Sequence, residues 1–134
     1  MRTNIEPSKK TPRVLVIDDN KDISEMLKDY FEIENIECSI INDGKAGLEE
    51  LRRDNGNYDF ILLDLAMPQY SGFDVFNKLR EENLLESKNI IIFTASAPKD
   101  NDPNRMIREG AKSILKKPFS LDDIRNLVER FTNY

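Results

Sequence analysis

Three carboxylates stand directly behind two apolar runs of the chain. Asp18 and Asp19 follow VLVI in the stretch VLVIDDN at 14–20, and Asp64 follows YDFILL at 58–63. Adjacent carboxylates repel each other, and burial disfavours their charged form, so a fold that gathers them needs a cation or a proton nearby. The chain has no histidine and a single cysteine. Oxygen ligands alone favour a hard cation, and Mg²⁺ takes one or two carboxylates with water and phosphate oxygens.

Two further polar side chains close other apolar runs. Thr94 follows NIIIF at 89–93, and Lys117 comes shortly after KSIL at 112–115. A metal ion and a lysine neutralise the charge that spreads over a phosphoryl group during transfer, and a hydroxyl donates to one of its oxygens. A carboxylate can itself be the nucleophile and form an aspartyl phosphate. Asp64 is the best-placed candidate, since it stands alone behind the central strand expected below.

Taken singly, these residues also have ordinary structural roles as helix caps, turn residues, strand ends or solvated side chains. Any of Asp18, Asp19 and Asn20 could cap the helix that follows them. Such roles do not explain why polar groups follow four separate strands at the same edge of a sheet, where open α/β sheets bind their ligands.

The elements that position these side chains follow from alternating periodicity. Apolar runs of strand length alternate with segments of helical period, which predicts an α/β fold: a (βα)5, doubly wound, five-stranded parallel sheet with helices on both faces. The expected strands are 13–17, 37–41, 58–63, 89–93 and 112–115. The expected helices are a first one with an apolar stripe of Ile23, Met26, Leu27, Tyr30 and Phe31, then 45–53, 72–82, 103–109 and one from Leu121 to Phe131.

Length and charge narrow the class of protein. The 134 residues fit one domain, expected at 12–134 behind a flexible lead-in at 1–11. The net charge of −5 argues against direct nucleic-acid binding. No apolar run approaches membrane-spanning length, and no signal-peptide pattern opens the chain, so we expect a cytoplasmic protein without membrane insertion. Cys38 is expected to be a small buried hydrophobe.

In their order and spacing, five stretches resemble the receiver domain of two-component response regulators. They are VLVIDDN, NDGKAGLEEL, YDFILLDLAMPQYSG, IIIFTAS and GAKSILKKPFS, and the resemblance covers about residues 12–133. It implies the flavodoxin-like strand order 2-1-3-4-5. It also implies a signalling phosphoprotein rather than an enzyme, with slow self-dephosphorylation at most.

The resemblance assigns roles at the metal site. Asp64 is similar to the phosphoacceptor, Asp19 to the direct Mg²⁺ ligand, and Asp18 to the acidic partner that acts through water. Asp64 and the backbone carbonyl of Ala66 are implied to complete the protein's share of the metal shell.

It also assigns the phosphoryl contacts and two departures from the family pattern. Thr94 resembles the switch hydroxyl, and Lys117 the lysine that pairs with the phosphoryl group, with a cis bond to Pro118 implied. Ile114 stands where the family usually has an aromatic residue that moves with the threonine, so the usual coupling is not expected here. Ser71 replaces a common aspartate, a change that a helix cap tolerates.

The resemblance implies a sensor histidine kinase or a histidine phosphotransfer protein as phosphoryl donor, and a downstream protein target that the sequence does not name. Change in the loop 95–104 would reach the face of the fourth helix, fifth strand and fifth helix, and dimerisation on phosphorylation stays open. One alternative is a pseudo-receiver that only binds partners. Another is a Mg²⁺-dependent hydrolase with an aspartyl nucleophile, which Ala66 disfavours because such enzymes commonly place an acid/base aspartate there. The chain could also be the receiver of a longer regulator.

Overall fold

The computed structural model describes residues 11–95 and 103–132, in which five parallel strands form one sheet of order β2-β1-β3-β4-β5. The elements in chain order are β1 (Arg13–Ile17), α1 (Lys21–Ile33), β2 (Glu37–Ile41), α2 (Gly44–Arg53), β3 (Phe60–Asp64), α3 (Gly72–Glu81), β4 (Ile90–Thr94), α4 (Pro103–Glu109), β5 (Ser113–Lys116) and α5 (Leu121–Thr132). This confirms the predicted fold class and strand order. Residues 1–10 of the expected lead-in and 96–102 of the expected loop lie outside the described residues.

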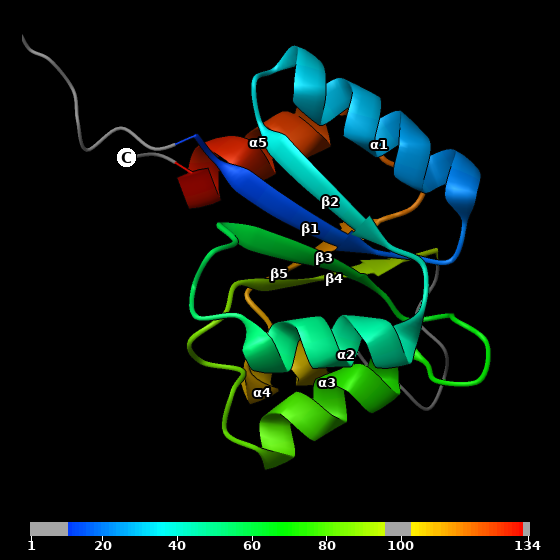
Figure 1. Cartoon of the computed structure of the whole chain (residues 1–134), viewed down its shortest axis with the longest axis vertical. Helices are drawn as coiled ribbons and strands as arrows, with labels where there is room; N and C mark the ends of the chain where they lie inside the picture. The colour runs from blue at the N-terminus through cyan, green and yellow to red at the C-terminus, as the bar shows by residue number, and fades with distance from the viewer. Residues whose placement is uncertain (1–10, 96–102, 133–134) are drawn as a thin grey trace, which may run out of the picture.

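The sheet lies between two layers of helices, with α1 and α5 on one face and α2, α3 and α4 on the other (Figure 1). Alternate residues of β1 point to opposite faces, as strand geometry requires. Leu15 and Ile17 join the core beneath α2 and α3, whereas Val14 and Val16 join the core beneath α1 and α5. Because both faces of the sheet are covered, β1 is buried along nearly its whole length and its end is held rigidly.

The register between β1 and β3 places Asp18 and Asp64 side by side. Ile17 pairs with Leu63 in the parallel ladder, so Asp18 and Asp64 come next at neighbouring strand ends. The expected strand at 58–63 is displaced by the structure to Phe60–Asp64. The reason lies at its start, where the Asp59 carboxylate accepts the backbone N–H of Arg13 at 2.8 Å and holds that segment as a loop.

Two other expected strands are also shifted by one residue. The structure places β4 at Ile90–Thr94 and β5 at Ser113–Lys116, each starting and ending one position later than expected. Their pairing accounts for the ends, since Asp64 pairs with Phe93, and Thr94 with Lys116. The polar residues Asp64 and Thr94 are therefore the last residues of their strands instead of the first residues after them.

The apolar stripe expected for α1 is wrong at Met26, whose surface is 50% exposed. The helix instead buries Ser24, Leu27 and Phe31, which lie at i, i+3 and i+7 on the face toward the sheet. Ser24 lies on this face because its hydroxyl donates to the backbone carbonyl of Asp18. The hydrogen bond to the end of β1 therefore places Ser24 on the buried face, where hydropathy alone predicts Met26.

The helix starts follow capping chemistry. Asn20 is the N-cap of α1 and its side chain accepts the N–H of Ile23, which decides among the three candidates. Ser71 caps α3 in a reciprocal capping box with Asp74, so the serine does serve as a cap. Cys38 is buried as expected, and burial raises the pKa of its thiol to about 12.

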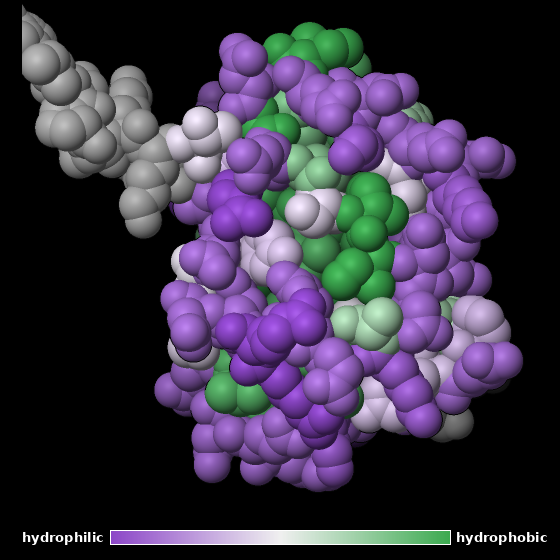
Figure 2. Space-filling model, in the orientation of Figure 1, coloured by the Kyte–Doolittle hydropathy of each residue, from purple (hydrophilic) through white to green (hydrophobic). Residues whose placement is uncertain are grey.

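No helix within residues 11–95 and 103–132 is long and apolar enough to cross a membrane. Hydrophilic residues cover most of the face seen in Figure 2, and hydrophobic residues surface in a strip between the helices of the two layers. The edge strand β2 lies there (Figure 1), and its Ile40 and Ile41 are only partly buried.

Candidate functional site

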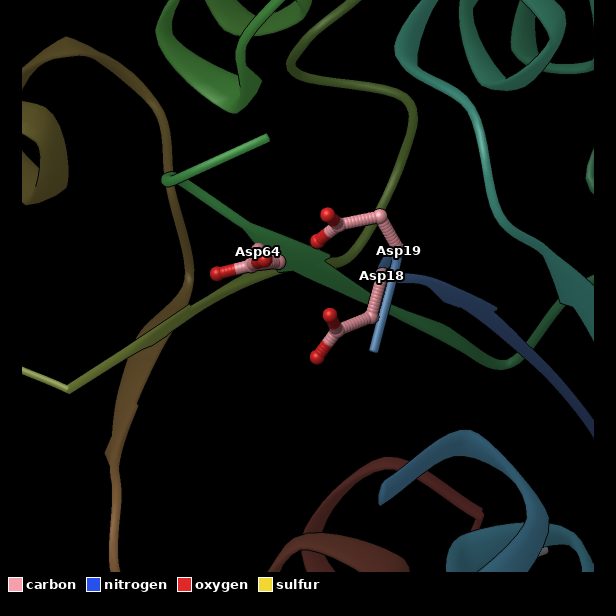
Figure 3. A group of neighbouring side chains, drawn as sticks. All are labelled: Asp18, Asp19 and Asp64. Atoms are coloured by element: carbon pink, nitrogen blue, oxygen red, sulfur yellow. The ribbon is translucent and has the colours of Figure 1, made fainter. Parts of the chain in front are cut away.

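The three predicted carboxylates lie together at the ends of β1 and β3, the edge of the sheet called the carboxyl edge below. Asp18, Asp19 and Asp64 each offer an oxygen within 4.8 Å of the others, and the three side chains are neighbours at the strand ends (Figure 3). Asp18 is fully buried and Asp64 is 4% exposed, whereas Asp19 is exposed to solvent. Within the described ranges this is the one such group of acidic, histidine or cysteine side chains.

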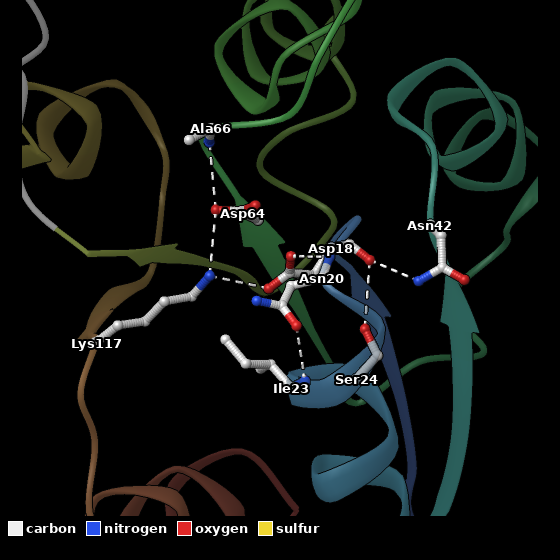
Figure 4. A network of polar contacts seen from close by, with 8 residues as sticks. All are labelled: Asp18, Asn20, Ile23, Ser24, Asn42, Asp64, Ala66 and Lys117. Carbon is white, nitrogen blue, oxygen red and sulfur yellow. Dashed lines mark hydrogen bonds and ion pairs between the residues drawn. The ribbon is translucent and has the colours of Figure 1, made fainter.

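Lys117 brings a positive charge to this cluster from the segment between β5 and α5. Its ammonium nitrogen lies 3.0 Å from Asp18 Oδ2 and 3.5 Å from Asp64 Oδ1 (Figure 4). The side chain is 16% exposed, so these contacts are shielded from bulk water. One ammonium among three carboxylates leaves the site with excess negative charge.

Backbone and side-chain donors hold Asp18 in place. Its carbonyl oxygen accepts the side-chain amide of Asn42 at 2.7 Å and the hydroxyl of Ser24 at 3.3 Å, and its carboxylate accepts the N–H of Asn20 at 2.9 Å (Figure 4). Sequence reasoning missed Asn42 and Ser24. A usable signal existed for Asn42 alone, because it directly follows the strand 37–41 and so reaches the same edge.

The backbone around Asp64 is equally constrained. The N–H of Ala66 donates to Asp64 Oδ1 at 3.2 Å. The first residue of α3, Gly72, packs so closely that a Cβ there would lie 2.0 Å from the carbonyl oxygen of Asp64. A side chain at this position would therefore push the end of β3 away, and glycine is required for the close approach.

The electrostatics single out Asp64. Burial raises its pKa, the neighbouring charge of Asp18 raises it further, and Lys117 and the Ala66 N–H oppose the shift, so that the pKa of Asp64 is about 6. Its ionised form is thus held at a cost that a bound cation would relieve. All-oxygen donors with surplus negative charge fit Mg²⁺, which favours carboxylates and water.

The remaining predicted residues lie around this cluster. Thr94 ends β4, is buried, and its carbonyl accepts the N–H of Lys117 at 2.8 Å. The bond between Lys117 and Pro118 is cis, as the resemblance implied. Ile114 is half-buried in β5 and packs against the core that α2 and α3 cover, so an aliphatic side chain occupies the expected aromatic position.

The amino-acid sequence matches known response regulators. A family model described as "Response regulator receiver domain" matches residues 14–129. The response regulator SaeR of Staphylococcus epidermidis is 32% identical over 120 residues, which are 90% of this chain and 48% of the relative. The chain thus spans about half the length of this curated relative.

Solved structures agree in fold. The receiver domain of the Francisella response regulator 1452 has a TM-score of 0.77 and 32% identity, covering 91% of this chain and 97% of that one. The receiver domain of the sensor histidine kinase PA1611 from Pseudomonas aeruginosa PAO1, with a magnesium ion coordinated in its active site cleft, has a TM-score of 0.76. At 22% identity over 93% of this chain and all of that one, the second likeness concerns the fold alone.

Proposed function

This chain belongs to the response regulator receiver family of two-component signalling, and from that premise we propose that Asp64 is its phosphoryl acceptor. One observation carries the proposal: Asp64 ends the central strand, with Asp18 and Asp19 beside it and the Lys117 ammonium 3.5 Å away. Nucleophile, surplus negative charge and a phosphate-pairing cation therefore meet at one place.

In the proposed step, a carboxylate oxygen of Asp64 attacks the phosphorus of a phosphohistidine on a partner protein. A P–O bond forms, the P–N bond breaks, and its electron pair stays on the imidazole nitrogen, which takes up a proton. The product is an aspartyl phosphate on this chain. A sensor histidine kinase or a histidine phosphotransfer protein is the proposed donor, met in the cytoplasm.

Asp19, Asp64 and the backbone carbonyl of Ala66 would hold Mg²⁺ directly, and Asp18 would act through water. Bound Mg²⁺ supplies positive charge that neutralises the phosphoryl oxygens and the surplus charge of the carboxylates. The support is the donor chemistry of the cluster, three carboxylates within 4.8 Å of one another.

Lys117 and Thr94 are the proposed phosphoryl contacts. Lys117 already spans the two buried carboxylates, so its ammonium needs only a small displacement to pair with a phosphoryl oxygen on Asp64. Because the Lys117 N–H donates to the Thr94 carbonyl, the two groups are tied at the backbone. We propose that change at Thr94 and the loop 95–104 alters the surface of α4, β5 and α5, on which a downstream protein or a second copy of the chain docks.

Two other functions fit less well. A hydrolase with an aspartyl nucleophile needs a positioned proton carrier, and the residue two positions after Asp64 is Ala66, whose side chain has none. A pseudo-receiver lacks part of the acceptor set, whereas Asp18, Asp19, Asp64 and Lys117 stand together here.

The test is incubation with acetyl phosphate and Mg²⁺, read as the mass of the intact chain. One added phosphoryl group is expected for the wild type, and its loss is expected for Asp64→Asn. Asp74→Asn is a matched control, since Asp74 is an exposed carboxylate at the start of α3, and it should be labelled like the wild type. Labelling that survives Asp64→Asn would contradict the assignment.

A further inference from the structure

Lys117 has a third neighbour besides the two carboxylates. Its ammonium nitrogen lies 4.4 Å from the centroid of the Phe93 ring, within the range at which a cation is attracted to an aromatic face. Phe93 is fully buried and pairs with Asp64 itself in the ladder between β3 and β4. The aromatic ring is thus fixed beside the acceptor by the same hydrogen-bonded sheet.

A second ring holds the first. The centroids of Phe93 and Phe119 are 5.6 Å apart with a tilt of 55°, a favourable aromatic geometry. Phe119 follows Lys117 by two residues and packs against the core beneath α1 and α5. The lysine and the ring that packs against Phe93 therefore come from the same short segment before α5.

These contacts lie on the opposite face of the sheet from Ile114. Ile114 packs against the core beneath α2 and α3, whereas Phe93 and Phe119 belong to the other core. The position that lacks the usual aromatic is therefore separated from Phe93, the ring that contacts the lysine, and from its neighbour Phe119.

The Phe93 ring and the carboxylates differ in how strongly they attract the Lys117 ammonium once a divalent cation is bound. With Asp18 and Asp64 committed to a divalent cation, much of their attraction for the ammonium is cancelled, and the ion repels it. The ring face carries no net charge for the ion to cancel, and as a hydrogen-bond acceptor it is far weaker than a phosphoryl oxygen. It attracts the ammonium in the loaded site as it does in the empty one.

We infer that Phe93 is a positioning residue for phosphoryl binding, holding the Lys117 ammonium at the carboxyl edge by its ring face. The inference rests on the proposed function, because the group that the ammonium is held to meet is a phosphoryl group on Asp64. Phe93 acts through Lys117 and touches no reacting atom.

The test replaces Phe93 by phenylalanines with one, two and three ring fluorines, which weaken the attraction for a cation with little change in shape. Two quantities are measured: the rate of labelling by acetyl phosphate at saturating Mg²⁺, and the affinity for beryllofluoride from an NMR titration. Both should fall stepwise, by about two- to tenfold across the series. The affinity for Mg²⁺ alone should not fall, because its ligands are carboxylates.

Phe60 is the matched control. It is fully buried in the same core, and its ring contacts are with Phe31 and Phe131. The same fluorine series at Phe60 should leave both quantities unchanged. A flat series at Phe93, or an equal fall at Phe60, would overturn the inference while the wild type still takes up a phosphoryl group. A wild type that binds neither phosphoryl nor beryllofluoride would overturn the proposed function and this inference with it.

Discussion

Two groups of lysine and aspartate side chains, both largely shielded from solvent, lie at opposite ends of the sheet, and they differ in charge balance. At the carboxyl edge, Lys117 faces Asp18 and Asp64, with Asp19 close by. At the other end, ahead of β3 and β4, Lys88 lies 3.8 Å from the carboxylate of Asp54, and both side chains are at most 4% exposed.

The Lys88 pair is balanced in charge, and both partners make hydrogen bonds. The Asp54 carboxylate accepts backbone N–H groups of Gly56 at 3.2 Å and Asn57 at 2.9 Å. The Lys88 ammonium also donates to the Asp54 carbonyl at 3.1 Å. One positive and one negative charge, each with further partners, tie the loop after α2 to the loop before β4. This arrangement needs no ligand and serves the fold.

The site at the carboxyl edge has more negative charge than its lysine can offset, and the raised pKa of Asp64 is the consequence. Lysine and aspartate side chains thus have different roles at the two ends of the sheet. A balanced buried pair stabilises the folded chain, whereas a surplus of carboxylates is the feature on which the proposed binding of a cation and a phosphoryl group rests.

The largest expected change in stability comes from removing one partner of the balanced pair. Lys88→Met should lower the free energy of unfolding by about 3–5 kcal/mol, because it leaves the Asp54 carboxylate buried without its cation. Urea denaturation measures the change. Lys116→Met, which removes an exposed lysine, should change it by less than about 0.5 kcal/mol. A loss below about 1 kcal/mol for Lys88→Met would mean that the two pairs do not differ in this way.

At the carboxyl edge, removing a charge should raise the free energy of unfolding instead of lowering it. Asp64→Asn should raise the free energy of unfolding by about 1–3 kcal/mol at pH 7.5 without Mg²⁺, since a shift from 3.8 to about 6 disfavours the charged form in the fold. Asp54→Asn is the matched variant and should lower it, because Lys88 is left without a carboxylate. A destabilised Asp64→Asn protein would contradict the comparison.

The pH dependence of this gain follows from the direction of the shift. The pKa of Asp64 in the folded chain lies above its ordinary value of 3.8. Asp64 therefore contributes its full share to the free energy of unfolding below pH 3.8, where it is protonated, and this contribution is lost as the pH rises through about 6. The gain from Asp64→Asn should therefore shrink toward zero near pH 4. Denaturation curves of both proteins at pH 4, 6 and 7.5 measure it.

Binding of the metal should also change the stability. At ten times its dissociation constant, Mg²⁺ should raise the free energy of unfolding of the wild type by about 1.4 kcal/mol, reversed by EDTA. Asp64→Asn should gain less, because it offers one carboxylate fewer. Lys88→Met should gain as much as the wild type, since its pair lies at the other end of the strands. An equal gain for Asp64→Asn would place the ion elsewhere.

Much of this molecule was predictable from its sequence. Alternating periodicity predicted five strands and the layers of helices, and the resemblance to receiver domains implied the strand order. The residues that follow the strands predicted the cluster of Asp18, Asp19, Asp64 and Lys117. Periodicity failed where a polar contact outweighed hydropathy. Met26 is exposed and Ser24 buried because the serine hydroxyl reaches the carbonyl of Asp18. No local pattern encodes that contact.

The amino-acid sequence by itself determined that carboxylates, a threonine and a lysine follow strands that end at one edge, because chain order and strand period dictate that edge. Only the tertiary structure decided how the charges pair. Lys117 lies 99 positions from Asp18, yet its ammonium is nearer to that carboxylate than to Asp64. It also decided that the ring under the ammonium is Phe93. Such contacts depend on strand register and on the reach of a side chain across the sheet, which the packed fold alone brings within a few ångströms.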